Sequence, residues 1–192
     1  MIKRILALLT ALTLAASVHA ATETYNIDQV HSSVGFSIRH LFSKFTSGFT
    51  KVSGTIAYDA AAPEKSSVTA TVEIRSLSTN NSKRDTHVLS PDFFDAAKFP
   101  TATFQSTAWT KTGEGSFDVT GNLTIKDVTK PVTFKVTFLG SGPGMGGSTV
   151  SGWEATTTIK KADFNVAGPA MLGKALGEEV TINIAIEAGY SK

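Results

Sequence analysis

Apolar and polar residues alternate with a period of two along most of this 192-residue chain. This alternation constrains the fold more than any other feature, because it is typical of strands that bury one face and expose the other. Eight or nine such strands are predicted, and helical patterns are confined to two short regions. The chain is therefore predicted to be all-β, as either a closed antiparallel barrel or a sandwich. Closure would remove the exposed strand edges that invite aggregation.

The residues assigned to the buried face combine large aromatic side chains with small residues. The aromatic side chains are Phe36, Phe104, Phe134 and Phe138. The small residues are Gly54, Ala70, Ala102, Gly121, Ala155 and Thr157. An eight-stranded barrel either fills its interior with side chains or holds one small ligand. The composition of the inner face leaves both outcomes open.

One stretch, residues 84–100, breaks the alternation and crowds charge, a histidine and three phenylalanines together. Asn80, Asn81 and Ser82 suit a helix start, and Pro91 suits the first position of a second helical turn. We predict a short helical segment around residues 81–95 that crosses one end of the β domain. Its phenylalanines, Phe93, Phe94 and Phe99, are predicted to point inward as a plug.

The first 20 residues have the features of a secretory signal peptide. Lys3 and Arg4 precede an apolar run that is too short to span a bilayer, and Ala20 ends a small-residue exit. We expect cleavage after Ala20, a periplasmic location, a single domain over residues 21–192, and no stable membrane insertion. The leader holds two of the 18 basic residues and none of the 16 acidic ones, so 16 of each remain. This balance argues against a nucleic-acid partner.

Several chemistries find little support in the sequence. His31, His40 and His87 match no compact metal-binding spacing. The glycines of 142–147 match a dinucleotide motif by letter, but a strand rather than a helix is predicted to follow them. The chain has no cysteine and no nucleophile-elbow motif. We therefore predict no catalytic residues, no metal, and no required cofactor other than a bound lipid, although a spatial triad stays open.

Four longer motifs stand out, and they read DQVHSSVGFSIRHL from residue 28, RDTHVLSPDFFDAAKFPTATF from residue 84, GNLTIKDVTKPVTF from residue 121, and IKKADFNVAGP from residue 159. These motifs resemble those of the YceI-like family, the polyisoprenoid-binding, lipocalin-like periplasmic proteins. Val88 stands where the family usually has leucine, and Lys161 where it has arginine. The matches occur in family order over residues 24–188. The resemblance implies an extended lipocalin-like barrel of about eight strands whose apolar pore holds a polyisoprenoid, an isoprenoid quinone or another amphiphilic chain.

This resemblance, together with the alternation, selects the candidate site residues. The predicted ligand-binding residues are Phe36, Ile38, His40, Phe49, Ile56, Val72, Ile74, Phe93, Phe94, Phe99, Phe104, Phe134 and Trp153. The candidates for the pore mouth or a head group are His31, Arg39, Arg84, Asp85 and His87. For Arg84 and Asp85 we favour a structural role, in which they tie the helix to the barrel wall.

The expected function is to carry or sequester such a lipid, with gating by residues 84–100 and by the apolar loop at 168–178. A second loop, at 140–148, is glycine-rich and predicted to be mobile. Two alternatives remain open: a stress-response barrel with a filled core, and an enzyme that acts on an isoprenoid lipid. The family resemblance also leaves a homodimer open.

Overall fold

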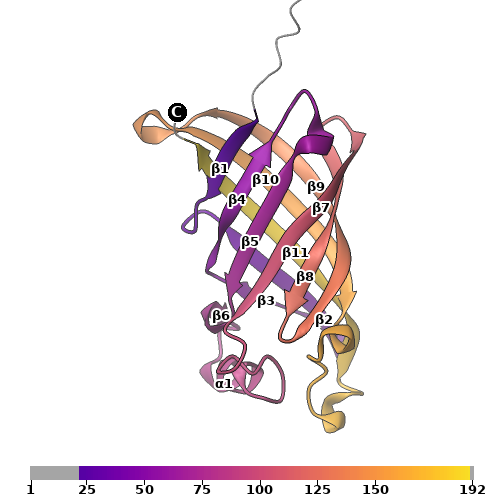
Figure 1. Ribbon diagram of the computed structural model, residues 1–192. Helices are drawn as coiled ribbons and strands as arrows, with labels where there is room; N and C mark the ends of the chain where they lie inside the picture. Colours follow the sequence, from indigo (N-terminus) through magenta and orange to yellow (C-terminus); the bar gives the residue numbers. More distant parts are fainter. Residues whose placement is uncertain (1–21, 191–192) are drawn as a thin grey trace, which may run out of the picture.

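A computed structural model describes residues 22–190, so the predicted signal peptide and its cleavage site lie outside the described residues (Figure 1). Within that range the chain forms eleven strands, one α-helix and five short 3-10 helices. The strands are β1 (Glu23–Ile27), β2 (Ser33–His40), β3 (Ser43–Phe49), β4 (Val52–Tyr58), β5 (Ser67–Glu73), β6 (Leu77–Ser78), β7 (Thr101–Gly113), β8 (Ser116–Ile125), β9 (Val128–Pro143), β10 (Thr149–Lys160) and β11 (Leu176–Tyr190). The helices are α1 (Ser82–Leu89), η1 (Pro63–Lys65), η2 (Ile74–Ser76), η3 (Met145–Gly147), η4 (Lys161–Phe164) and η5 (Ala170–Leu172). No helix within residues 22–190 is long and apolar enough to cross a membrane.

Eight strands close into an antiparallel barrel, as the alternation and the family resemblance predict. The ring runs β1-β4-β5-β7-β8-β9-β10-β11, and it closes where β1 pairs with β11 at Asn26↔Gly189 and Ile27↔Ala188. Long hairpins build most of the wall, and residues 114–115 form the turn between β7 and β8. The sandwich alternative is therefore excluded.

The wall changes its strands along its length, because β11 has two successive partners on one side. Residues 188–189 of β11 pair with β1, whereas residues 176–185 pair with β2. Strand β2 then pairs with β3, and β3 with the short β6. Thus β1 in the upper half of Figure 1 gives way to β2 and β3 in the lower half.

The predicted helical segment begins as expected and ends earlier. The Asn81 side chain accepts a hydrogen bond from the backbone N–H of Arg84 at 3.0 Å, which caps α1. The helix ends at Leu89, because Ser90 has extended backbone angles and Pro91 follows it in a turn. Residues 90–98 therefore form turns rather than a second helical turn. The whole segment lies below the barrel in Figure 1.

The glycine-rich stretch at 140–148 holds a shorter loop than predicted, because residues 140–143 continue β9 and only residues 144–148, which include η3, lie between the strands. Strand β9 continues to Pro143 and pairs with β10 as far as Thr149. The glycines instead accompany a register shift next to Gly152, and Gly140 has a positive φ of 134°. An irregular ladder thus replaces the first part of the predicted loop, and residues 144–148 connect the two strands.

Two different interiors result from this wall. The upper half is packed with side chains around Tyr25, Trp109, Phe117 and Trp153, all at most 5% exposed. The lower half holds two smaller groups of buried residues, one around Phe164 and one around Ile74. These two groups lie around the cavity described next.

Candidate functional site

An apolar cavity of about 530 Å³ occupies the barrel interior and reaches its lower end. This volume is typical of small-molecule sites. The wall comes from the inward-facing residues of nearly every strand, from α1 and from the irregular segment before β11. Of the thirteen predicted ligand-binding residues, all except Phe99 lie on the cavity wall. Phe99 instead packs under the ammonium group of Lys98, 5.0 Å from its ring centre.

The upper end of the cavity is closed by two tryptophans. Trp109 and Trp153 line the cavity and belong to the packed upper core, with their rings 6.0 Å apart and perpendicular. Trp153 Nε1 donates a hydrogen bond to Ser151 Oγ at 2.9 Å, which fixes that ring. Trp109 Nε1 is buried and has no hydrogen-bond partner among the described residues. This closed upper end forms the floor of the cavity, and it is rigid and almost entirely apolar.

The lower end is partly covered by Phe93, which the sequence predicted to be a plug. Its ring contacts the His87 ring at 5.2 Å, and its backbone carbonyl accepts a hydrogen bond from Lys126 Nζ at 2.9 Å. Gly168, with φ at 76°, lies against the same ring, because a Cβ there would approach it to 2.5 Å. Any larger residue at position 168 would push Phe93 away.

The ionisable side chains on the cavity wall are basic. They are His40, Lys44, Arg84, His87 and Lys161, and no aspartate or glutamate joins them. Lys44 lies on the cavity wall and pairs with Arg39 near the β2–β3 turn, which places it close to the mouth. Lys161 Nζ donates to the carbonyl of Ala167 at 2.9 Å. The wall itself carries no carboxylate, but His87 Nε2 is 2.8 Å from Asp92 Oδ2 beside it, so the mouth offers hydrogen-bond donors and positive charge chiefly through Lys44, Arg84 and Lys161.

Arg84 and Asp85 both bind Thr79, which fits the structural role favoured for them. Arg84 donates to the Thr79 side chain at 3.0 Å and to its carbonyl at 2.7 Å, while its guanidinium lies 4.6 Å from the Phe45 ring centre. Asp85 Oδ1 accepts the backbone N–H of Thr79 at 2.8 Å. These contacts fasten α1 beneath β3 and β6. Arg84 additionally faces the cavity, whereas Asp85 does not.

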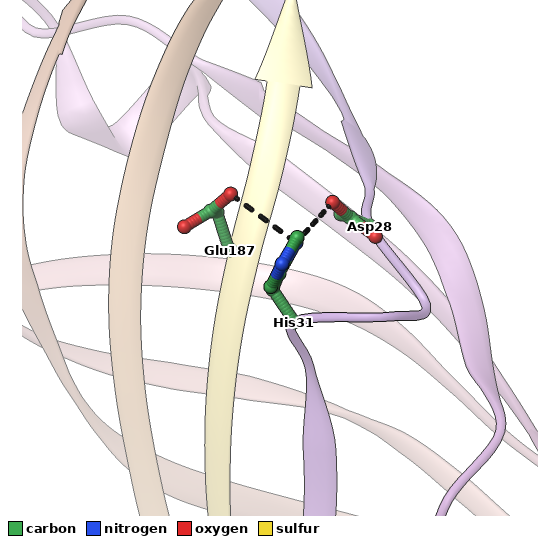
Figure 2. A group of neighbouring side chains, drawn as sticks. All are labelled: Asp28, His31 and Glu187. Carbon is green, nitrogen blue, oxygen red and sulfur yellow. Dashed lines mark hydrogen bonds and ion pairs between the residues drawn. The ribbon is translucent and has the colours of Figure 1, made fainter. Parts of the chain in front are cut away.

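The two remaining mouth candidates lie outside the cavity. Arg39 is exposed and donates to the carbonyl of Leu41 at 2.8 Å. His31 lies on the outer wall, where Nδ1 is 2.7 Å from Asp28 Oδ2 and 3.7 Å from Glu187 Oε1 (Figure 2). The hydrogen bond and negative charge of Asp28, helped by Glu187, raise the pKa of His31. The hydrogen bond from His31 in turn lowers the pKa of Asp28.

Asp28, His31 and Glu187 are close enough to share one cation. The metal expectation weighed only the three histidines, and the structure gives His31 carboxylate neighbours instead. The raised pKa of His31 favours the imidazolium, which pairs with both carboxylates without a metal. The arrangement therefore fits an ion-paired cluster at the turn between β1 and β2.

Several wall residues escaped the sequence-based selection. They are the buried Leu123, Ile125, Phe164 and Val166, with Leu172 and Leu176 beside them. Phe164 is 1% exposed and follows β10 in a 3-10 turn, where the period of two no longer indicates which side chains point inward. For Leu172 and Leu176 the signal was the apolar composition of the segment around 168–178, which was noted without assigning its residues to the wall.

A closed antiparallel barrel with a one-ended apolar cavity defines the lipocalin-like class. Residues 25–188 match the YceI-like domain family, so the chain belongs to that family. It is 41% identical over 177 residues to a UPF0312 protein of Pseudomonas syringae pv. tomato, a match that covers 92% of each chain. A UPF0312 protein of Pseudomonas fluorescens is 40% identical over 186 residues, covering 95% of this chain and 97% of the other.

Solved structures share the same architecture. BcnA of Burkholderia cenocepacia superposes with a TM-score of 0.78 at 27% identity, covering 84% of this chain and 99% of its own. A Campylobacter jejuni YCEI protein gives 0.69 at 28% identity, covering 79% and 88%. A polyisoprenoid binding domain from Saccharophagus degradans gives 0.66 at 16% identity, covering 87% and 98%, a likeness that concerns the fold alone.

Proposed function

We propose that the protein binds the hydrocarbon chain of an isoprenoid or similar amphiphilic lipid inside its barrel. The observation that carries this proposal is a cavity with one open end, an aromatic floor and only a few polar groups near its mouth. Family membership and the name of one structural neighbour, a polyisoprenoid binding domain, support it. We infer binding rather than catalysis because no carboxylate lies on the cavity wall of the described residues, and the His87–Asp92 pair beside it, 2.8 Å apart, is exposed to solvent.

The energetics of such binding are simple. Each CH₂ group moved from water into the cavity stabilises the complex by about 0.8 kcal/mol. An engineered cavity of about 150 Å³ holds benzene, so 530 Å³ holds on the order of 20 carbons by the same ratio. Longer chains would have to protrude through the mouth or displace the floor. Tight binding therefore needs no directional contact with the chain.

The basic mouth selects the end of the lipid that remains outside. His40, Arg84 and Lys161 can each contact a head group beside the opening. Charge-assisted hydrogen bonds are about twice as strong as neutral ones. We therefore propose that lipids with an anionic head, such as a phosphate ester, bind more tightly than the corresponding alcohols. Because the first 20 residues have the features of a signal peptide, we propose that this carriage or storage takes place in the periplasm.

Native mass spectrometry of lipid-stripped protein tests the proposal directly. The probes are a C20 prenyl phosphate and the C20 prenyl alcohol, which share one chain. We expect one lipid per chain for both, with the phosphate preferred by about tenfold. Lys161→Gln should narrow that preference, whereas Lys111→Gln, at the opposite end of the barrel, should leave it unchanged. If neither probe binds, lipid binding is excluded; equal binding of both would exclude only the anionic preference.

A further inference from the structure

Apolar side chains are exposed at the rim of the cavity, where the β2–β3 turn meets the segment before β11. Phe42 is fully exposed, Met171 is 87% exposed, and Leu41 is 49% exposed. Isolated exposed apolar residues are ordinary on protein surfaces. These three belong to two neighbouring segments at one end of the barrel, so they require a common explanation.

The two segments are held together by the backbone. The Leu41 N–H donates to the carbonyl of Ala175 at 2.7 Å, and His40 pairs with Leu176 in the sheet. Leu41 has a positive φ of 51°, which turns the hairpin sharply and leaves Phe42 at its tip. The turn is braced from the side by Arg39, which donates to the carbonyl of Leu41. The exposed side chains therefore project from a backbone that hydrogen bonds hold in place.

The same two segments carry positive charge, and the first acidic residue after the second segment is Glu178. Residues 39–45 and 168–177 contain Arg39, His40, Lys44 and Lys174 but no aspartate or glutamate. The opposite end of the barrel provides a comparison, because Leu139 and Met145 are also exposed there, 61% and 95%. Residues 139–147 around them contain no charged residue of either sign. Of the segments compared, those at the rim of the cavity combine apolar tips with basic side chains, whereas residues 139–147 do not.

We propose that this rim, Leu41, Phe42 and Met171 with Arg39, Lys44 and Lys174, docks the protein onto the surface of an anionic lipid bilayer. Apolar side chains beside Lys and Arg suit the interface of such a bilayer, where the tips enter the head-group layer and the cations meet anionic lipids. The inference rests on the proposed function, since a long-chain lipid is nearly insoluble in water and resides in membranes. Docking places the cavity mouth against the membrane that holds the lipid, so that the lipid chain enters the cavity without crossing water.

Vesicle co-sedimentation of the purified protein tests the docking surface. Phosphatidylcholine vesicles with and without phosphatidylglycerol separate the apolar and the electrostatic contributions. We expect binding to the anionic vesicles, weakening as the Debye length shortens from about 10 Å in 0.1 M salt to about 3 Å in 1 M salt. Phe42→Ser with Met171→Ser should lower the affinity by at least about tenfold, since both tips lose their buried surface. Met145→Ser, the matched change at the other end, should have no effect.

A transfer assay separates docking from lipid binding. The protein takes up a C20 prenyl phosphate either from anionic vesicles or from detergent micelles in the absence of vesicles. We expect Phe42→Ser with Met171→Ser to slow uptake from vesicles by about tenfold while the affinity measured in detergent stays unchanged. Equal vesicle binding by the wild type and this variant would overturn the proposal. It would also be overturned if the wild type bound neither kind of vesicle but bound a second copy of itself or another protein. Failure to bind lipid in detergent, with vesicle docking intact, would instead overturn the proposed function alone.

Discussion

The upper and lower halves of the barrel share most of their strands but use their interiors in opposite ways. In the upper half, Trp153 packs against Phe138 at 4.6 Å and Tyr58 at 5.0 Å between ring centres, and Phe117 is 2% exposed. In the lower half, inward-facing small residues such as Ala102 and Ala155 face open space. The upper half resembles a protein core, whereas the lower half resembles a binding site. The filled-core alternative thus describes the upper half only.

The change of strands explains part of this difference. Strand β1 in the upper wall gives way to two strands, β2 and β3, in the lower wall. Because the diameter of a barrel grows with its number of strands, the lower half has more interior to fill. Small side chains in the lower half leave part of this larger interior empty, and the aromatic side chains of the upper half close the cavity at its upper end. Backbone width and side-chain size therefore act together to make a cavity with one floor and one mouth.

The largest expected difference is in stability. Phe117→Ala in the upper core should lower the free energy of unfolding by about 3–5 kcal/mol, because a closely packed ring leaves a new void. Phe36→Ala on the cavity wall should cost about half of that or less, since one side of its ring already faces open space. Urea unfolding of lipid-free protein measures both.

The lipid must be removed before this comparison, because a ligand that binds only the folded state raises its apparent stability. With lipid present, Phe36→Ala would combine lost packing with lost binding. Equal losses for the two variants in the lipid-free protein would mean that the lower half is as closely packed as the upper half. The distinction between core and cavity would then fail.

A smaller effect is expected from filling the cavity. Ala155 lies on β10, where it pairs with Val136 of β9 and Ile184 of β11. It is two residues along the strand from Trp153, and it lines the cavity. Ala155→Phe should occupy the space that a lipid chain uses, and so weaken binding of a C20 prenyl chain by more than about tenfold. Its unfolding free energy should change by less than about 1 kcal/mol, because the ring enters space that is already open.

Ala108→Phe is the matched control for this filling experiment. Ala108 is exposed on the outer wall, so the same added ring should leave both lipid affinity and stability unchanged. Fluorescence competition and urea unfolding report the two quantities. Unchanged lipid affinity in Ala155→Phe would show that the chain binds elsewhere.

Much of this arrangement could be predicted from the sequence, because period-two alternation fixes which side chains point inward. Phe36 and Ile38 are examples, and both lie on the cavity wall. The alternation fails where the backbone turns: Phe99 follows a series of turns and lies off the wall, and Phe164 was not selected. Nor could it show that the barrel is filled at one end only, since that depends on which rings meet across the interior.

Contacts between distant parts of the chain could not be predicted from the sequence either. Glu187 lies 156 residues after His31, and only the pairing of β11 with both β1 and β2 brings it to the turn that joins them. The Asp28 N–H donates to the Glu187 carbonyl at 2.9 Å, and Ser32 Oγ donates to the same oxygen at 3.1 Å. The turn between β1 and β2 is thus the point at which β1, a strand of the filled upper half, ends and β2, a strand of the hollow lower half, begins. We call this turn the seam.

The smallest expected effect is a pH-dependent loosening of that seam. Because the pKa of His31 is raised above its ordinary 6.5, protonated His31 stabilises the fold fully below 6.5, and the contribution is lost as pH rises through the raised value. Because the pKa of Asp28 is lowered below its ordinary 3.8, its contribution is present above 3.8 and is lost as pH falls through the lowered value. Both contributions are therefore complete between about pH 4 and pH 6.5.

His31→Gln keeps a hydrogen-bonding side chain at the seam but removes the titrating charge. Its loss of stability relative to the wild type should be greatest between about pH 4 and pH 6.5, and should shrink above neutrality as the wild-type imidazole loses its proton. Thermal unfolding at a series of pH values measures the difference, which should be small because all three side chains are at least partly exposed. A difference that stays constant from pH 5 to pH 9 would show that His31 holds the two halves together by shape rather than by charge.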